Sequence, residues 1–550
     1  MASSFLGLSI SLSGLFANQR SLGVVSHNIA NANTEGYSRQ VMNTQAYKPQ
    51  MLPGGMGSIG VGVDVTAIKQ IRDEYLDFKY RSETSTKGEW EARSSVLSQI
   101  EGIFNEPTDS SIGKLLDNYY ESLQKLSKNA EDLTARTLFR QNTIALTDGV
   151  ARISNMLTQL QRDMNSQFQS SVNELNTYAN QIVSLNKSIY ETELEGGKAN
   201  DLRDQRNVLV DKMSELVPVT YYEDEQNRFH VLIDGHLMVS HFRSESVKLV
   251  NRVDKLNESD DDKIYDVQWS NGDSFDVDTG KLAGLRDVRD NISGDQKGIP
   301  YYVSKLDEFV DVLADTMNGI HEKGYGLNGG TGYYMFTIDN MSTEEFKTYL
   351  LNKGLDGEQA VEVTSSVLDG VSGLNEEDKL KKIGENISKI LMNNPDFKGK
   401  SVKLINDRYY VTDCIKSSDL TIASDLEDLN NFAAASSIED IPGGNDNALL
   451  MVATRHNIKL YEWGSPEDYV KSLVSNLGVD SAEAKRVSSN QAQLVNEFSV
   501  SRDSVMGVSL DEEMANMIKF QTAYNASARM INVFDEMLDL LVNRLGTVGR

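Results

Sequence analysis

The side chains that could carry chemistry are few and scattered in this 550-residue chain, which contains six histidines and one cysteine. The histidines occupy positions His27, His230, His236, His241, His321 and His456. Their spacing matches no metal-binding motif such as HExxH or a Cys/His cluster. His230 and His236 lie in an expected hairpin at cross-strand distance, and a pair of strands explains them better than a metal site does.

Two acidic segments and the lone thiol also fail to make a site. Asp260, Asp261 and Asp262 are typical of a solvated loop. Residues 276–280 begin like a calcium-binding loop but lack the glycine at its sixth place and the remaining oxygen ligands. No GxSxG or Walker motif occurs, and the glycine-rich segment GGMGSIGVGVDV is interpreted as a loop that leads into a strand or hairpin. Cys414 has no His–Asn context for nucleophilic catalysis. The sequence therefore predicts a structural or interaction protein that is not an enzyme, with no catalytic residue, metal or cofactor.

The charge of the chain is unevenly distributed. The net charge is −27. Residues 1–50 carry three basic and one acidic side chain, and residues 501–550 carry five basic and seven acidic ones, so the two ends cancel. The acidic middle disfavours nucleic acid as a partner. The near-neutral ends can pack against copies of themselves without charge repulsion.

Neither a secretory signal nor a membrane span is expected. The first basic residue is Arg20, and the apolar residues before it alternate with serine instead of forming a continuous apolar core. The chain has no run of about 18 apolar residues. With Cys414 as the single cysteine, an intrachain disulfide is impossible.

The elements that must organise the molecule are its two ends. Between residues 509 and 546 apolar side chains recur every seven positions, which predicts a helix about 55–60 Å long that packs lengthwise against another helix. The recurring residues are Leu510, Met517, Tyr524, Ile531, Leu538 and Leu545, and Met514, Ala528 and Val542 follow three of them by four residues.

A weaker heptad pattern predicts a helix over residues 4–32. Its apolar positions are Leu8, Leu12, Leu15, Leu22 and Ile29. Gly7, Gly14 and Gly23 weaken the helical propensity of this segment. The first and last helices are therefore expected partners of each other, with both ends of the chain at one end of an elongated molecule.

The segments between them alternate in type. A long apolar stripe from Leu146 to Ile189 predicts one helix that ends at Gly196, and shorter helices are expected at 86–104 and 111–128. The Asp234-Gly235 pair predicts a hairpin within a β-rich segment. We expect an elongated α+β multidomain fold, with coiled-coil-like terminal and body helices and inserted β-rich and mixed α/β domains. The expected domains are 1–45 paired with 506–550, a helical body of 46–215, 296–332 and 432–505, a small β-rich insert at 216–295, and a variable mixed α/β insert at 333–431.

The turn after the first helix carries a recognisable string, SHNIANANTEGYSRQ at residues 26–40. This string closely resembles the N-terminal signature of the bacterial flagellar rod, hook and hook-associated family. An ordinary helix stop would explain one or two of its residues, not the whole string. The signature positions are Asn28, Ile29, Ala30, Asn31, Thr34, Gly36 and Tyr37.

The ending Gly-Tyr-Ser-Arg-Gln resembles the hook-associated members in particular. Five further stretches resemble the same members, in their order along the chain. They are ANDLRDQR at 199–206, GKLAGLRD at 280–287, the residues Met317, Asn318, His321 and Gly324, GGNDNA at 443–448, and SLDEEMANM at 509–517.

The resemblance implies a structural adaptor subunit that joins the flagellar hook to the filament as a short layer at their junction and is needed for filament assembly. The implied partners are the hook protein, a second junction protein on the flagellin side, further copies of the chain, and an export chaperone on the C-terminal helix. It further implies type III export without a cleaved signal peptide and an extracellular place in the flagellum. The terminal heptad residues, from Leu8 to Ile29 and from Leu510 to Leu545, would then form the assembly interface.

Other functions remain open from the sequence. A distal-rod or hook protein shares the N-terminal signature but should lack the strings at 202–206 and 511–517. An adhesin function could reside in the inserted domains, and an enzyme could reside in the insert at 333–431. Nothing in the sequence demands either addition.

Overall fold

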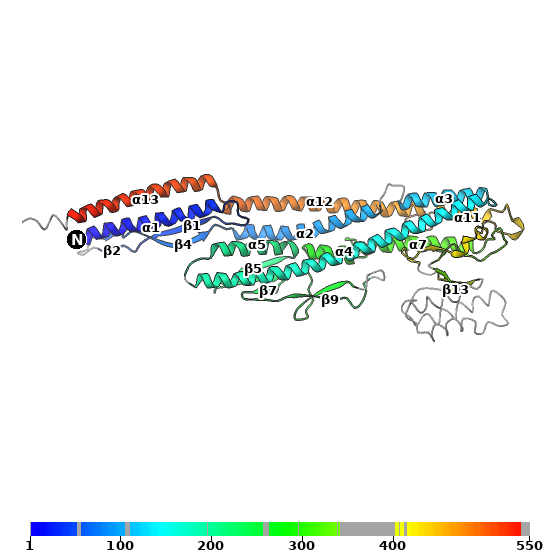
Figure 1. The fold of residues 1–550 in the computed structure, drawn as a ribbon, viewed down its shortest axis with the longest axis horizontal. Helices are drawn as coiled ribbons and strands as arrows, with labels where there is room; N and C mark the ends of the chain where they lie inside the picture. The colour runs from blue at the N-terminus through cyan, green and yellow to red at the C-terminus, as the bar shows by residue number, and fades with distance from the viewer. Residues whose placement is uncertain are drawn as a thin grey trace, which may run out of the picture.

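The helices lie side by side along one long axis and form a narrow bundle (Figure 1). The computed structural model describes residues 2–51, 57–104, 111–194, 196–256, 263–294, 296–337, 339–341, 402–405, 408–411 and 415–540. Most of the insert expected at 333–431, together with Cys414, Val542 and Leu545, lies outside these residues. The molecule is thus an elongated mixture of helices with several small sheets.

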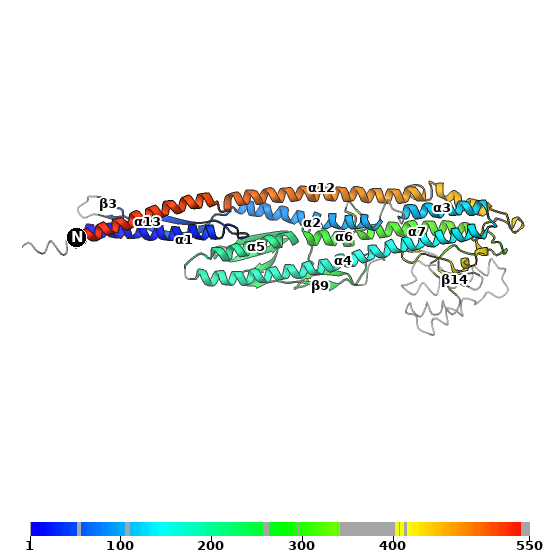
Figure 2. The ribbon, with the colours of Figure 1, turned by 45° about the horizontal axis from the view of Figure 1, so that its top comes forward.

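The helices differ greatly in length, and the longest ones run along the long axis of the bundle. The described helices are α1 (Ala2–Ala30), α2 (Glu74–Phe104), α3 (Ile112–Lys128), α4 (Leu133–Glu193), α5 (Asn200–Leu216), α6 (Lys281–Asp290), α7 (Ile299–His321), α11 (Asp446–Ala453), α12 (Pro466–Met506) and α13 (Leu510–Asp539). In both views α1 and α13 form one end, α2, α4, α5 and α12 the middle, and α3, α7 and α11 the other end (Figures 1 and 2).

The strands form small antiparallel sheets on the outside of the helical bundle. The pair β1 (Gln40–Ala46) and β4 (Val63–Gln70) carries β2 (Gln50–Met51) and β3 (Ser58–Ile59) at its tip. A four-stranded sheet contains β5 (Val219–Glu223), β6 (Phe229–Ile233), β7 (His236–Ser240) and β8 (Arg243–Ser244), beside the pair β9 (Val247–Asn251) and β10 (Tyr265–Trp269). The remaining short strands are β11 (Phe336–Thr337), β12 (Asp339–Met341), β13 (Val402–Ile405), β14 (Arg408–Val411) and β15 (Thr421–Ile422).

The core lies around α4. This helix begins at the Asp132 N-cap, whose side chain accepts a hydrogen bond from the Thr134 amide. The predicted stripe from Leu146 to Ile189 is buried, which confirms that interpretation. The helix packs on α3, α5, α6 and α7, so its whole length lies inside the body.

The Asp-Gly hairpin is also confirmed. Asp234 and Gly235 both have positive φ, 46° and 80°, as a two-residue turn with the favoured twist requires. The register places His236 opposite Ile233 and His230 opposite Ser240. The two histidines are therefore not paired across the strands as expected.

The segment expected to be β-rich up to residue 295 ends in a helix instead. Leu282, Leu285 and Val288 recur at helical spacing and bury α6 against α2 and α4. A Cβ added to Gly284 would lie 2.5 Å from the backbone oxygen of Glu89, so only glycine permits this close packing. The string GKLAGLRD thus belongs to the helical body.

A short link separates the last two helices. α12 ends at Met506, and the Ser509 side chain caps the start of α13 by accepting a hydrogen bond from the Glu512 amide. The described end of α13 lies beside the start of α1, at one end of the bundle (Figure 1). None of the helices described in the structure is long and apolar enough to cross a membrane.

Candidate functional site

The terminal helices α1 and α13 pack antiparallel along their length (Figures 1 and 2). A Cβ added to Gly7 would lie 2.4 Å from Cζ of Phe534, and one added to Gly14 would lie 3.3 Å from Oγ of Ser527. A step of seven residues toward the C-terminus of α1 therefore corresponds to a step of seven residues toward the N-terminus of α13. The glycines that weaken α1 as an isolated helix are the positions where α13 comes closest.

The predicted heptad of α13 is only partly on the side that faces α1. Met517, Tyr524, Ile531 and Leu538 are half-buried. The positions that complete the seam are Phe520, Ser527 and Phe534, which lie three residues after the first three of these and not four. Leu510 and Met514, which the same heptad includes, are exposed.

The expected interface residues of α1 lie at the edge of its packed face. Leu8, Leu15, Leu22 and Ile29 are half-buried, and Leu12 is exposed. The residues buried most deeply are Ala17, Ser21, Val24, Val25 and Asn28, which the sequence analysis did not select as packing positions. The signal that could have found this face is the seven-residue spacing of the small or polar residues Gly7, Gly14, Ser21 and Asn28.

The β1–β4 pair covers a second side of α1. The Ser13 hydroxyl accepts a hydrogen bond from the Val63 amide at 3.2 Å, and Ser21 contacts the sulfur of Met42 at 3.8 Å. The helix is thus held between α13 and a strand pair.

Asn28, at the end of α1, is the centre of the signature turn. Its side-chain amide donates to the backbone oxygen of Gln40 at 2.9 Å and to Glu513 Oε2 at 3.1 Å. Its side-chain oxygen accepts from the Tyr37 hydroxyl at 2.8 Å and from the Gln40 amide at 3.0 Å. Both donors and both lone pairs of the amide are therefore used, which explains why an asparagine occupies this buried position.

The other signature residues shape the turn. The Asn31 side chain donates to the His27 backbone oxygen, and the Thr34 hydroxyl donates to Asn31. Gly36 has a φ of 72° and lies against Val208, so a side chain there would meet both backbone strain and a clash. Ile29 is half-buried and Ala30 is exposed.

Tyr37 lies between α1 and the acidic residues of α5. Burial raises the pKa of Tyr37, and the nearby carboxylates of Asp201, Asp204 and Glu513 raise it further. The phenol therefore stays protonated and remains the donor to Asn28.

The turn continues into the string at 199–206. The Ser38 amide and hydroxyl donate to the two oxygens of Asp204 at 2.9 and 2.7 Å, and Arg72 pairs with Asp204 at 3.2 Å. Burial raises the pKa of Asp204, although the Ser38 hydrogen bonds and Arg72 oppose that shift. Gln40 donates to Asp201 at 2.7 Å, which ties β1 to the start of α5.

Arg39 connects the turn to α13. Its guanidinium pairs with Glu513 at 2.8 Å and with Glu512 at 2.7 Å. Its backbone amide donates to the Met506 oxygen at the end of α12. One residue of the signature string thus contacts both sides of the link between α12 and α13.

A second ion-pair group holds the adjoining body helices. Asp211 of α5 pairs with Arg81 of α2 at 2.6 Å and with Arg502 of α12 at 2.7 Å. Burial alone would raise the pKa of Asp211, but the two guanidinium groups outweigh it and the pKa is lowered. We call the polar cluster of Asn28, Tyr37, Ser38, Arg39, Arg72, Asp204, Asp211, Arg502 and Glu513 the joint, because it connects the α1–α13 pair to the body.

Two other family-like stretches meet at the opposite end of the body: the one that contains His321 and Gly324, and GGNDNA at 443–448. The Ala433 amide donates to Nε2 of His321, while Nδ1 of His321 lies 2.6 Å from the Tyr333 oxygen. The Asn447 side chain donates to the Ala433 oxygen at 2.8 Å and packs against Gly324. These contacts order the far end of the body.

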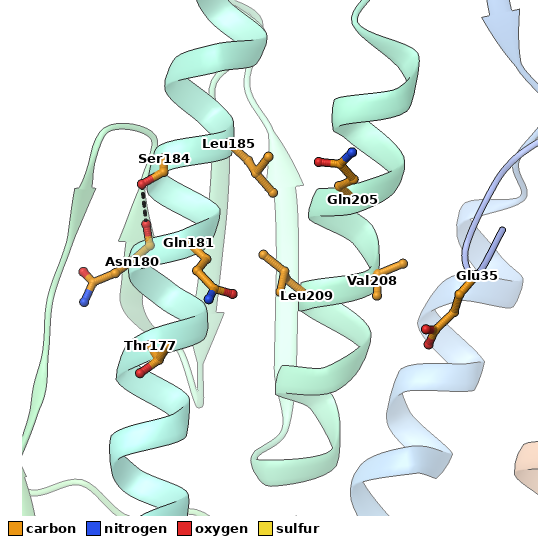
Figure 3. A pocket seen from close by; sticks show the side chains of 9 residues that line it. All are labelled: Glu35, Thr177, Asn180, Gln181, Ser184, Leu185, Gln205, Val208 and Leu209. Atoms are coloured by element: carbon orange, nitrogen blue, oxygen red, sulfur yellow. Dashed lines mark hydrogen bonds between the residues drawn. The ribbon is translucent and has the colours of Figure 1, made fainter.

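A groove of about 640 Å³ lies between α4 and α5, next to the signature turn (Figure 3). Leu185 and Leu209 point into the space between the two helices, and Val208 points toward the loop that carries Glu35. Glu35 is the one ionisable residue among its lining side chains, so the groove holds no acid–base pair. Across the described part of the chain, no three His, Cys, Asp or Glu side chains gather as a metal site.

Comparisons with known proteins assign the middle and the ends of the chain separately. Residues 97–336 match the family model of the flagellar hook-associated protein FlgK helical domain. Residues 8–37 match the flagella basal body rod protein model, and residues 503–545 match the C-terminal model of the flagellar basal body rod FlgEFG proteins.

Curated relatives match over the full length. Flagellar hook-associated protein 1 of Bacillus subtilis (strain 168) is 28% identical over 580 residues, covering 100% of both chains. Flagellar hook-associated protein 1 of Escherichia coli (strain K12) is 26% identical and covers 97% of this chain and 98% of its own. The similarity of this chain to flagellar hook-associated protein 1 thus extends over its whole length.

The resemblance of residues 26–40 to this group is therefore confirmed. A solved structure supports the fold: the flagellar hook junction protein FlgK from Burkholderia pseudomallei superposes with a TM-score of 0.55 at 13% identity, covering 78% of this chain and 100% of that one. The relatives that this chain resembles are flagellar hook-associated proteins.

Each of the two rod-type matches includes part of the joint. The first ends at Tyr37, directly after the signature turn, and the second begins at Asp503 and includes Glu513. Arg72, Asp77, Arg81, Asp211 and Arg502 were not expected as site residues. Their ion-pair partners lie between 5 residues away, for Arg72 with Asp77, and 425 residues away, for Arg502 with Asp77. Of these contacts, only the α5 contribution was hinted at, by the string at 199–206.

Proposed function

We propose that the chain is the structural adaptor subunit of the hook–filament junction, which polymerises as a short layer and is needed for filament assembly. The terminal helix pair would line the inner tube of this layer, and the acidic body would face water. In this role the chain is not an enzyme, and its heptad residues act as contact surfaces.

The observation that carries the proposal is the apolar face that the α1–α13 pair leaves uncovered. Soluble monomers rarely expose a continuous apolar surface unless it binds something. The two helices are moderately acidic, with one basic side chain in α1 and six acidic and two basic ones in α13. Its exposed residues are Leu12, Phe16, Leu510, Met514, Ile518, Met530, Val533, Met537 and Leu540.

The same face sets the proposed roles of the heptad residues. Leu510, Met514 and Leu12 would contact neighbouring subunits. Met517, Tyr524, Ile531 and Leu538 would hold α13 on α1 within one subunit, and the half-buried Leu8, Leu15, Leu22 and Ile29 would lie at the boundary between the two kinds of contact. Leu545 continues the repeat beyond the described residues.

The partners follow from the position at a junction. We assign the hook protein to one side of the layer, the second junction protein to the flagellin side, and further copies of the chain within the layer. An export chaperone would cover the apolar side of α13 before assembly. The chain would leave the cell through the flagellar type III apparatus without a cleaved signal peptide and reside outside the cell.

A rod or hook protein of the wider family is the second candidate. The match of residues 97–336 to the hook-associated helical domain favours the junction protein over it. An enzyme in the insert at 333–431 would fall largely outside the described residues. An adhesin function would reside in the inserted domains at 216–295 and 333–431, of which the structure describes mainly the first.

Substitution of one exposed residue tests the proposal. Ile518→Asp places a charge on the uncovered side of α13, where the native side chain is 67% exposed. Purified Ile518→Asp should keep the thermal unfolding temperature of the parent within about 2 °C, because exposed positions contribute little to stability. Cells that carry only this variant should make hooks but lose filaments and swimming.

The matched control is Val479→Asp, which changes an apolar residue of α12 with 63% exposure. It should leave filaments intact. Normal filaments on cells carrying Ile518→Asp, at normal export levels, would contradict the proposed assembly surface.

A further inference from the structure

The apolar contacts of the α1–α13 pair repeat and therefore do not select one alignment. Gly7 receives Phe534, and Gly14 faces Ser527 one heptad further along. If α13 moved by seven residues, about 10 Å along the axis, Phe534 or Phe520 would meet Gly14. Glycine leaves room for the ring in either case, so the packing of small against large residues allows more than one register.

A single buried charge interrupts this repeat. The Glu513 side chain is 2% exposed, and it accepts hydrogen bonds from Asn28 Nδ2 at 3.1 Å and Arg39 Nε at 2.8 Å. A shift of seven residues would separate the carboxylate from both donors. It would leave a buried charge without these two partners and one N–H of the Asn28 amide unsatisfied, which is strongly unfavourable.

We infer that Glu513 determines the register of α13 on α1. Buried polar residues select register in coiled coils by the same principle, because misaligned pairs bury an unsatisfied group. Glu512 does not share this property. It also pairs with Arg39, at 2.7 Å, but its side chain is 61% exposed and can be solvated in any register.

The three-residue link between α12 and α13 is the competing determinant. Extended, it spans on the order of 10 Å, so it limits how far α13 can move along α1. The link therefore restrains α13 to nearby registers, and Glu513 selects among them.

Disulfide trapping on the purified full-length chain tests the inference independently of the proposed function. In a Cys414→Ser background, Gly14→Cys with Ser527→Cys reports the native register, since a Cβ at residue 14 lies 3.3 Å from the Ser527 hydroxyl. Gly14→Cys with Phe520→Cys reports a shift of one heptad away from the joint. Ser21→Cys with Ser527→Cys reports a shift of one heptad toward it.

Each cysteine pair is introduced into three backgrounds, namely the chain with native Glu513, the Glu513→Leu variant and the control variant Glu512→Leu, and the yield of disulfide is compared. With Glu513 or Glu512→Leu, the native disulfide should form and the shifted ones should stay at background. With Glu513→Leu, one of the shifted disulfides should rise at least tenfold. Exclusive native cross-linking in Glu513→Leu would overturn the inference. So would the loss of all three disulfides with an unchanged body unfolding transition, because Glu513 would then hold the helices together without choosing their alignment.

Discussion

At the scale of single residues, Asn28 contributes more to the signature turn than any apolar neighbour can. Its four hydrogen bonds join α1, the turn, β1 and α13 around one amide. Because the site is fully buried, each of these bonds forms without competition from water. One residue therefore links two of the family-like strings, at 26–40 and 509–517.

Replacing Asn28 by aspartate should disrupt the joint without changing its shape. Asn28→Asp exchanges the donor amide for an oxygen that faces Glu513, so two carboxylates would lie about 3 Å apart. We expect the α1–α13 pair to lose about 2–4 kcal/mol of stability, as for other broken buried polar pairs. Hydrogen exchange of the amides in residues 10–40 measures this loss.

The control is Asn33→Asp, which makes the same chemical change at an exposed position of the turn. Exchange rates in Asn33→Asp should equal those of the parent. Equal rates in both variants would contradict the central role of Asn28.

His321 makes the far end of the body sensitive to acid. The side chain is fully buried, and burial lowers its pKa to about 4, with a smaller contribution from Arg136. Since the Ala433 amide donates to Nε2, the ring accepts there and must be neutral in the folded chain. In the unfolded chain the same ring takes up a proton near its ordinary pKa of 6.5.

Stability should therefore fall as the pH drops through the window between about 6.5 and 4, by up to roughly 3 kcal/mol from this group. His321→Gln cannot titrate and should be less stable at pH 7 but lose less on acidification. Urea unfolding of the body at pH 7, 6, 5 and 4 provides the measurement. Parallel pH profiles for the parent and His321→Gln would show that the histidine does not contribute.

At the scale of elements, the α1–α13 pair depends on a fit between small and large residues. The clearest contact is Gly7 against Phe534. Gly7→Leu should push the helices apart and cost about 1–3 kcal/mol, as overpacking commonly does. Phe534→Ala leaves a gap at the same place and should also weaken the pair.

The double variant distinguishes a local fit from a general loss of helix. Gly7→Leu with Phe534→Ala returns the missing volume to the contact, so it should recover about 1–2 kcal/mol relative to the sum of the single changes. Amide exchange in α1 is again the readout. Strict additivity of the two losses would show that the residues do not contact each other.

The sequence predicted these helices better than it predicted their faces. The seven-residue repeats of α1 and α13 and the apolar stripe of α4 follow from helical spacing alone. The contacting side of α13 could not be chosen, because Leu510 and Met514 are as apolar as Met517 and Phe520. The decisive information lay on the partner helix, at Gly7 and Gly14.

The joint was less predictable for a different reason. The resemblance of the string from Ser26 to Gln40 to the family signature indicated that this side of the joint is important. The ion pairs of Asp211 with Arg81 and Arg502 join residues 130 and 291 positions apart. With 81 acidic and 54 basic side chains, the chain offers too many possible pairs for sequence spacing to select these.

At the scale of the whole molecule, the body and the terminal pair are separate packing units. The main hydrophobic core extends from Val96 to Ala484 and contains no residue of α1 or α13. Removal of residues 510–550 should therefore leave the unfolding temperature of the body within a few degrees of the parent. Because the truncation exposes the α1 seam, amide exchange should accelerate in residues 2–40 alone.

Calorimetry and hydrogen exchange of the truncated chain test this separation. A broad loss of protection in α2, α4 or α12 would mean that the terminal pair stabilises the body as well. In cells, the truncated chain should be unable to support filaments.

The body is connected to α13 through a short link, Gly507, Val508 and Ser509, so a small rotation at this link would produce a large displacement at the far end of the body. α12 ends at this link after it has run along the body for 41 residues, or about 60 Å. A rotation of the body by about 10° at the joint would displace the far end of α12 by on the order of 10 Å. The hydrogen bonds and ion pairs of about 3 Å around Arg39 and Asp204 would therefore determine the position of the far end of the body, about 60 Å away. If the chain forms the proposed layer of subunits, the tolerance of those few bonds would set the tolerance of the whole layer.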